Sequence, residues 1–196
     1  MAGQRSGFDF TLHMRRVTGD VVARLAELSH IDLSRVAFSF AQARKNVRHG
    51  VWATLTPMRF AGGSLTCRRG GRAWTVERLF DEGGREMLYI LNFYLPRFMD
   101  LPLDEKLTTL VHELWHISPE FDGDLRRHPG RCYAHGGSQR RYDAAMAGLV
   151  RRWRAQSPPD ELYQFLEGDF AALCREHGPV YGIRVPAPKM IRVSAA

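Results

Sequence analysis

The sequence has few cysteines, no long apolar run and no recognisable leader peptide. Its cysteines, Cys67, Cys132 and Cys174, are odd in number and widely spaced, which argues against a disulfide framework and fits a reducing compartment. No apolar stretch reaches the roughly 18 residues that a membrane span needs. Residues 1–16 mix acidic, basic and polar side chains and lack the apolar core of a secretory signal. We therefore expect a cytoplasmic protein with no membrane partner.

Lysine is also scarce, although the chain is strongly basic. Lys45, Lys106 and Lys189 are the only lysines, so the net charge of +7 comes almost wholly from arginine. Basic proteins attract polyanions, and the planar arginine fork suits bidentate phosphate contacts. A coding bias toward arginine explains the same composition without any ligand. Nucleic-acid binding through an arginine-rich surface is therefore one of two open interpretations.

The length and composition are those of one globular domain with a sizeable core. The chain has 196 residues, of which 44% are hydrophobic and 25% charged, and these are ordinary values for such a domain. We see no internal repeat or low-complexity linker. The order of helical and strand-like segments predicts an α+β fold, with residues 1–17 as an N-terminal extension, 18–178 as the domain and 179–196 as a C-terminal tail.

Hydrophobic periodicity predicts one helix and two strands in the first third of the chain. The helix begins at Thr18 or Asp20 and ends near His30. Alternating side chains predict strands over two segments, 36–43 and 51–56. A proline follows the second strand, which ends it there or places it at a sheet edge.

The most apolar segment, residues 88–95, predicts a strand that is buried on both faces. We expect residues 74–80 to pair with 87–95 as a hairpin across the turn at 81–84. The alternative for 88–95 is a strand whose free edge pairs with a peptide substrate. The sequence does not show which strand holds the edge.

Residues 111–117, Val-His-Glu-Leu-Trp-His-Ile, contain the His-Glu-x-x-His pattern of zinc sites on a helix. Asp104 is the expected N-cap, and Ser118-Pro119 is expected to end the helix. Apolar side chains recur at helical spacing along one side. They are Leu107, Leu110, Val111, Leu114 and Ile117.

The two histidines of this pattern fall on the opposite side of the helix. At about 100° per residue, His112 and His116 lie roughly 40° apart, so both imidazoles can hold one zinc ion. Glu113 projects beside them, where it can take a proton from a metal-bound water without binding the metal. The plainer interpretation is an amphipathic helix with solvated histidines.

A catalytic zinc has three protein ligands and an open position, so a third ligand is expected downstream. His135, just before the next helix, is the first candidate, and His128 is the alternative. A thiolate is more typical of a closed structural site, which disfavours Cys132. Carboxylates of the same loop are further candidates: Glu120, Asp122 and Asp124.

Some residues after the motif have a structural and a functional interpretation. We favour a plain turn for 122–124, although one of its carboxylates, or Asp143, could orient a ligand histidine. Tyr133 and Tyr142 are near enough in sequence to donate a hydroxyl to a developing oxyanion. Tyr142 falls on an apolar stripe, however, and is expected to pack in the core.

Two helices are predicted to follow, one capped by Ser138 and one running from Asp160 to Gly178. The first has an apolar stripe of Tyr142, Ala145, Met146, Leu149 and Trp153. The tail, residues 180–193, is expected either to pack as a strand or to trail over the surface. The other histidines are scattered and are interpreted as surface or hydrogen-bonded residues: His13, His30, His49 and His177.

Residues 104–146 resemble a known family. The segment from His112 to Ile117, followed by Phe-Asp-Gly-Asp-Leu-Arg at 121–126, resembles the zinc metallopeptidase domains of prokaryotes and phages, which are similar in layout to SprT-like zincins. That branch carries a later His-Gly that opens a helix with an aromatic residue soon after, and His135-Gly136 and Tyr142 match it.

The resemblance implies a zincin-like fold, with a helix behind a small sheet and the metal helix beneath the cleft. It also implies His135 as the third ligand. SprT-like proteins often carry a cysteine-rich zinc ribbon near the C-terminus, which Cys174 alone cannot form. Their DNA-linked role is therefore not transferred on this resemblance.

The expected function is a zinc metallopeptidase that uses Zn²⁺ and acts on a protein or peptide, with Glu113 as general base. The alternative is a nucleic-acid-associated protein with a structural zinc, and the two combine in a DNA-tethered protease. A zincin kept as a non-catalytic interaction module is a third possibility. The arginines behind the second hypothesis are Arg126, Arg127, Arg131, Arg140, Arg141, Arg151, Arg152 and Arg154.

Overall fold

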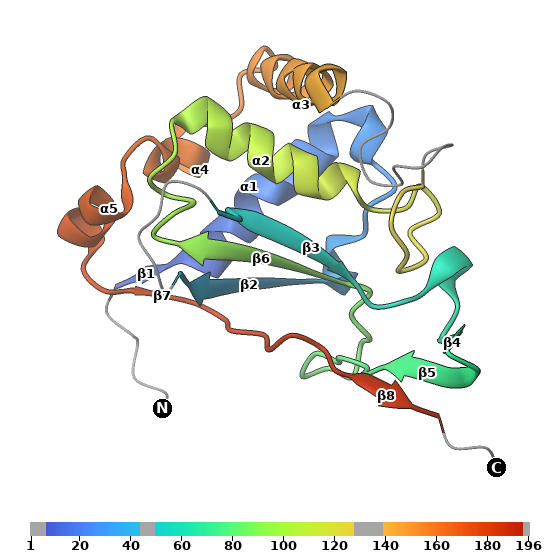
Figure 1. Ribbon diagram of the computed structural model, residues 1–196. Helices are drawn as coiled ribbons and strands as arrows, with labels where there is room; N and C mark the ends of the chain where they lie inside the picture. Colours follow the sequence, from blue (N-terminus) through green and yellow to red (C-terminus); the bar gives the residue numbers. More distant parts are fainter. Residues whose placement is uncertain (1–6, 44–49, 128–138, 194–196) are drawn as a thin grey trace.

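A mixed three-stranded sheet forms the centre of the molecule (Figure 1). The computed structural model describes residues 7–43, 50–127 and 139–193. Strand β6 (Tyr89–Leu95) lies between β2 (Val36–Gln42), to which it is parallel, and β3 (Ala53–Pro57), to which it is antiparallel. The fold is α+β, as predicted.

The strand predictions for this sheet are confirmed. Strand β6 is central, so it has no free edge for a peptide, and it is fully buried on one face and partly buried on the other, where Asn92 and Tyr94 lie. The edge strands are β2 and β3, and β3 ends at its proline, as expected of that residue type.

Two helices cover one face of this sheet, α1 (Phe10–Arg24) over β2 and α2 (Leu103–Trp115) over β3 (Figure 1). Phe10 of α1 lies at the centre of the core, with its ring centroid 6.4 Å from that of Phe40 and 5.7 Å from that of Phe93. The predicted apolar stripe of α2 faces the same core, and all of it is buried. The residues on the opposite side of α2 are outside this core.

Helix α1 (Phe10–Arg24) begins earlier than predicted. The Asp9 carboxylate caps it by accepting a hydrogen bond from the Leu12 N–H. The polar residues of this segment hid the helical spacing of its buried side chains. These buried side chains are Phe10, Met14, Val17 and Val21. The helix crosses the predicted boundary between residues 17 and 18, and it ends before a short 3₁₀ turn (Ala26–Leu28) instead of reaching His30.

The predicted hairpin between 74–80 and 87–95 forms only at its turn, where an isolated bridge joins Phe80 to Glu86, and the rest of the predicted pairing is wrong. Strand β5 (Arg72–Val76) pairs with β4 (Thr66–Arg69) across Gly70-Gly71 and with β8 (Met190–Arg192) from the tail. Both glycines have positive φ, a conformation that favours glycine in so tight a turn. The tail also adds β7 (Val180–Tyr181) beside β1 (Phe8–Asp9), so it packs as strands.

Helix α2 starts at Leu103, and Pro102 before it takes the N-cap position predicted for Asp104. Asp104 and Glu105 lie in the first turn, where their charge suits the helix dipole. Within the core, the Lys106 amine donates to the carbonyls of Leu166 and Gly168, each at 2.7 Å. These two bonds attach α2 to the C-terminal helices.

Helix α3 (Gln139–Arg154) packs on α2, and most of its predicted stripe is buried. Ala145 is the exception, because it is exposed. The helix predicted from Asp160 to Gly178 is divided into three pieces, since the Asp169 side chain caps a new helix. The pieces are α4 (Asp160–Tyr163), a 3₁₀ turn (Gln164–Leu166) and α5 (Phe170–His177).

Further 3₁₀ turns occur at Leu33–Arg35 and Ala61–Gly63. Among the described residues, no helix has the length and apolar character needed to cross a membrane.

Candidate metal centre and active site

His112 and His116 are brought together on the side of α2 opposite its apolar stripe, and both are partly buried. Their Nε2 atoms are 3.0 Å apart, and the two rings meet edge to face at 78°. Zinc–nitrogen bonds of about 2.0–2.1 Å in a tetrahedral site put two nitrogens about 3.3 Å apart. A hydrogen bond between the rings gives a similar distance. The pair therefore fits two ligands of a metal site with only a small adjustment.

The end of α2 is fixed by the chain that returns beside it. His116 is the C-cap, and its carbonyl accepts a 2.7 Å hydrogen bond from the Arg126 N–H. The Arg126 side chain donates to the Trp115 carbonyl and stacks its guanidinium 4.3 Å from the Trp115 ring centroid. These contacts hold the His116 backbone in place.

The loop that follows α2 is anchored in the core by Tyr89. The Tyr89 hydroxyl donates to the Asp124 carbonyl at 2.8 Å and accepts from the Gly123 N–H at 3.0 Å. The Asp124 carboxylate accepts from the Gly62 N–H and pairs with Arg127. The interpretation of 122–124 as a structural turn is confirmed by these bonds.

Glu113 connects α2 to the edge of the sheet. Its Oε2 accepts a 2.8 Å hydrogen bond from the Leu55 N–H of β3. Burial raises the pKa of Glu113 to about 7, although the bond from Leu55 acts in the opposite direction. Both protonation states are therefore accessible near neutral pH, which suits a group that takes up and returns a proton.

Tyr142 of α3 closes the site from the other side. Its ring centroid is 4.9 Å from that of His112 and 6.1 Å from that of His116. Burial raises the pKa of Tyr142, and the charge of Glu113 adds to the effect, so the phenol stays neutral at physiological pH. Tyr142 packs in the core, as predicted, and it also contacts both histidines.

A cleft of about 470 Å³ opens beside Glu113 and His112. Its floor is α2, and its wall is the start of β3 with the residues before it. The lining residues are Gly50, Val51, Trp52, Ala53, Asp104, Glu105, Thr108, Thr109, His112, Glu113 and Asp143.

The outer edge of β3 can be assigned from its ladder. The Tyr94 N–H donates to the Trp52 carbonyl, and the Met58 N–H donates to the Leu88 carbonyl. Residues alternate along an antiparallel pair, so the even-numbered residues of this segment pair with β6 and the odd-numbered ones point outward. Ala53 and Leu55 therefore direct their backbone groups toward the cleft and α2.

The candidates for the third metal ligand lie mostly outside the described residues. His128, Cys132, Tyr133 and His135 all lie outside them. Within the described part of the chain, no group of three histidines, cysteines or carboxylates could hold a metal ion. The nearby carboxylates have other contacts, since Glu120 accepts from the Ser118 hydroxyl and the two aspartates stabilise the turn.

The other described histidines lie away from this site. His13 contacts the Asp9 carbonyl through Nδ1 and stacks on Phe8, and His177 also contacts the Phe8 ring. His30 is partly buried, and burial lowers its pKa. These contacts agree with structural roles, while His49 lies outside the described residues.

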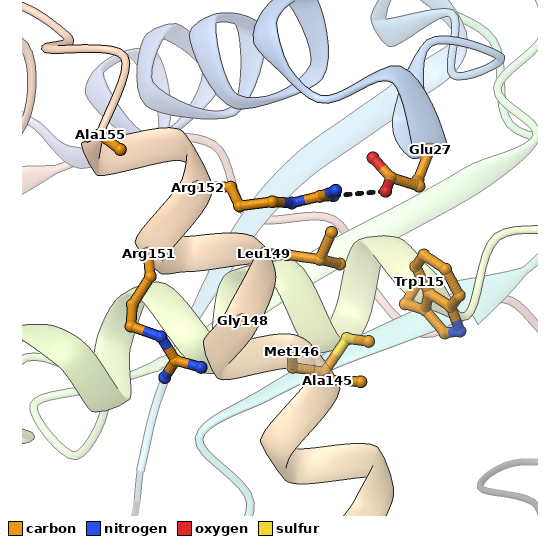
Figure 2. Close-up of a pocket in the computed structure, with 9 residues that line it drawn as sticks. All are labelled: Glu27, Trp115, Ala145, Met146, Gly148, Leu149, Arg151, Arg152 and Ala155. Carbon is orange, nitrogen blue, oxygen red and sulfur yellow. Dashed lines mark hydrogen bonds and ion pairs between the residues drawn. The ribbon is translucent and has the colours of Figure 1, made fainter.

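A second hollow, of about 620 Å³, lies between α3 and the end of α2 (Figure 2). Trp115, Met146 and Leu149 give it an apolar lining, and Arg152 points across it to an ion pair with Glu27. Its lining residues include no histidine or cysteine. The cleft at Glu113 is therefore the better place for metal chemistry.

Sequence reasoning missed two contributors to the site, the Leu55 amide and the Tyr89 hydroxyl. Backbone amides carry no sequence signal, and Tyr89 looks like any other apolar residue of a buried strand.

Comparison of the chain with protein-family models, with curated proteins and with solved structures found no match. The functional assignment therefore depends on the geometry of the site.

Proposed function

We propose that this protein is a zinc-dependent peptidase with a zincin-like arrangement. The layout supports it, since α2 runs along the edge of a small sheet and α1 covers the same sheet behind it. The observation on which the proposal depends is the position of Glu113. This half-buried carboxylate with a raised pKa lies one residue from His112 and is held by the sheet edge.

His112 and His116 would hold the Zn²⁺, with His135 as the predicted third ligand and His128 as the alternative. When bound, Zn²⁺ supplies a Lewis acid that polarises the scissile carbonyl and acidifies water. Glu113 takes the proton from the attacking water and returns it to the leaving amine. Because Oε2 is held by the Leu55 N–H, Oε1 is the oxygen that we expect to carry this proton.

The substrate that fits the cleft is an extended peptide. Ala53 presents its backbone N–H and carbonyl to the cleft, and Leu55 presents its carbonyl, because its N–H is bound to Glu113. A peptide strand can pair with these groups by adding to the edge of β3, which has no strand partner on that side among the described residues. The ladder would then lead the peptide toward Glu113 and the histidines.

The test combines metal content with cleavage in the same set of proteins. Zinc is measured by mass spectrometry, and cleavage is measured on casein, for the parent and for Glu113→Gln and His112→Ala. Glu105→Gln is the matched control, because it removes a carboxylate from the same helix and the same cleft. His128→Ala and His135→Ala identify the third ligand.

We expect Glu113→Gln to keep zinc and to lose cleavage by about 100-fold or more, while Glu105→Gln keeps both. His112→Ala is expected to lose zinc and cleavage together. Equal cleavage by the parent and Glu113→Gln would refute the proposal. Stoichiometric zinc with no turnover in the parent would favour the non-catalytic interaction module.

A further inference from the structure

The small sheet formed by β4, β5 and β8 has one face that is both basic and aromatic. Directly opposite residues of an antiparallel sheet share a face. Cys67, Trp74 and Arg192 are opposite one another. Arg69 and Arg72 are opposite each other two residues further along, so they lie on that same face. We call Arg69, Arg72, Trp74 and Arg192 the basic face.

The charge of this sheet is not compensated locally. The three strands contain no aspartate or glutamate. Within the described part of the chain, neither Arg69, Arg72 nor Arg192 takes part in an ion pair. All three are exposed, and Trp74 lies between them with its ring nitrogen donating to the Arg69 carbonyl.

Four of the arginines near α3 that the sequence offered as candidates for nucleic acid already have partners. Arg152 is paired with Glu27, and Figure 2 shows its side chain directed at that carboxylate. Arg127 pairs with Asp124, and Arg154 pairs with Asp104. Arg126 lies over the Trp115 ring. A phosphate would have to compete with these existing contacts, which the arginines of the basic face do not have among the described residues.

Nothing in the described part of the chain buries this sheet. None of the residues in its three strands is buried, and Met190 and Ile191 are 43% and 47% exposed. Figure 1 shows it on the side of the molecule away from α2 and α3. A three-stranded sheet is normally stabilised by packing one face on something. A partner that covers this one must tolerate several positive charges.

We propose that the basic face binds single-stranded nucleic acid. The arginines contact phosphates, and a base stacks on the Trp74 ring, the combination by which proteins bind single strands without reading their sequence. Charge complementarity favours a polyanion over a neutral peptide, and the aromatic side chain favours unpaired bases over a duplex. The inference is independent of the peptidase proposal.

The test is fluorescence anisotropy with a labelled 15-nucleotide oligo(dT), with duplex DNA of the same length as a competitor. The first variant is Arg69→Gln, Arg72→Gln and Arg192→Gln combined. The matched control removes the same charge from exposed arginines elsewhere, by combining Arg16→Gln, Arg151→Gln and Arg175→Gln.

We expect the first variant to bind at least about tenfold more weakly at low salt, and the control to change less than about twofold. Three phosphate contacts predict a slope of about −2 in log affinity against log salt, and the variant is expected to lose most of it. Equal losses in the two variants would overturn the proposal, since net charge alone would then explain binding.

Variants of Trp74 distinguish the contribution of base stacking to binding from that of charge. Trp74→Ala is expected to weaken binding by about fivefold or more, while Trp74→Phe, which keeps a ring, loses much less. Circular dichroism identifies any variant that does not fold. If Trp74→Ala does not fold, Trp74→Phe still tests the role of the ring. Tighter binding to polyglutamate or to phosphatidylserine vesicles than to oligo(dT) would overturn the assignment in favour of an acidic protein or a membrane.

Discussion

Replacing Tyr89 by phenylalanine tests how much the buried Tyr89 hydroxyl contributes to holding the loop after α2. Tyr89 is fully buried, and its hydroxyl bonds both the Gly123 N–H and the Asp124 carbonyl. The substitution removes one oxygen and leaves the ring, which packs against Phe121 with centroids 5.3 Å apart. The change in stability therefore reports on the two hydrogen bonds.

The magnitude follows from what each partner retains. The Asp124 carbonyl keeps a longer bond of 3.3 Å from the Ser118 N–H. The Gly123 N–H loses the Tyr89 oxygen, and a buried donor without an acceptor costs about 1–3 kcal/mol. With a smaller contribution from the weakened carbonyl, Tyr89→Phe is expected to lower the free energy of unfolding by about 2–3 kcal/mol.

The assay is urea unfolding followed by circular dichroism, with the slope against urea compared between proteins. Tyr94→Phe is the control, because Tyr94 is partly exposed and its hydroxyl has no resolved hydrogen bond in the described residues. We expect it to change the free energy by less than about 0.5 kcal/mol. Equal stability of Tyr89→Phe and the parent would show that the hydroxyl does not hold the loop.

Three further predictions concern charge and the sheet edge. Hydrogen bonds from Arg78, and then from Arg59, lower the pKa of Glu86 to about 2. The ionised Glu86 therefore stabilises the folded protein fully above pH 4.5, and this contribution is lost as the pH falls toward 2. Glu86→Gln should lower the free energy of unfolding by about 2 kcal/mol at pH 7 and by almost nothing near pH 2, as measured by urea unfolding. Burial lowers the pKa of Lys106 to about 8, so between pH 8 and 10.5 the unfolded chain binds more protons than the folded chain. The parent should therefore gain stability as the pH rises over that range, while Lys106→Met should not, as measured by thermal unfolding. If peptides pair with β3, Ala53→Pro should raise the KM for a peptide substrate about tenfold without loss of the β6 ladder, and an unchanged KM would contradict strand pairing.

Elements set by local pattern could be predicted from the sequence. Three local patterns were each sufficient to predict the element that carries them, because one face of each element is buried in the same core. They are the alternation in β2, the apolar run of β6 and the apolar stripe on α2. Helix α1 was misplaced because Arg15 and Arg16 interrupt its buried positions, and an N-cap such as Asp9 is a weak signal alone.

Strand pairing was harder to predict, because it depends on segments far apart in the chain. Strand β5 pairs with β8, which lies more than a hundred residues later, so no local turn reveals it. The same limit applies to the site. Helical spacing predicted the juxtaposition of His112 and His116, which the structure shows, whereas the bond from Leu55 to Glu113 depends on which strand occupies the edge.

The bond between Leu55 and Glu113 has a consequence for how a peptide would lie in the proposed active site. A strand that adds to β3 pairs first with Ala53, whose outward N–H and carbonyl face the cleft. It cannot use the next outward donor, because the Leu55 N–H is already bound to Glu113. The following outward residue, Pro57, has no N–H at all. The hydrogen bonding between β3 and the peptide must therefore weaken beside Glu113. The peptide is free to bend toward His112 at that point, next to the carboxylate that accepts the proton. On this reasoning Glu113 both limits the register of the substrate and takes the proton of the attacking water. Glu113→Gln, whose amide oxygen can still accept from the Leu55 N–H, should therefore reduce turnover far more than binding.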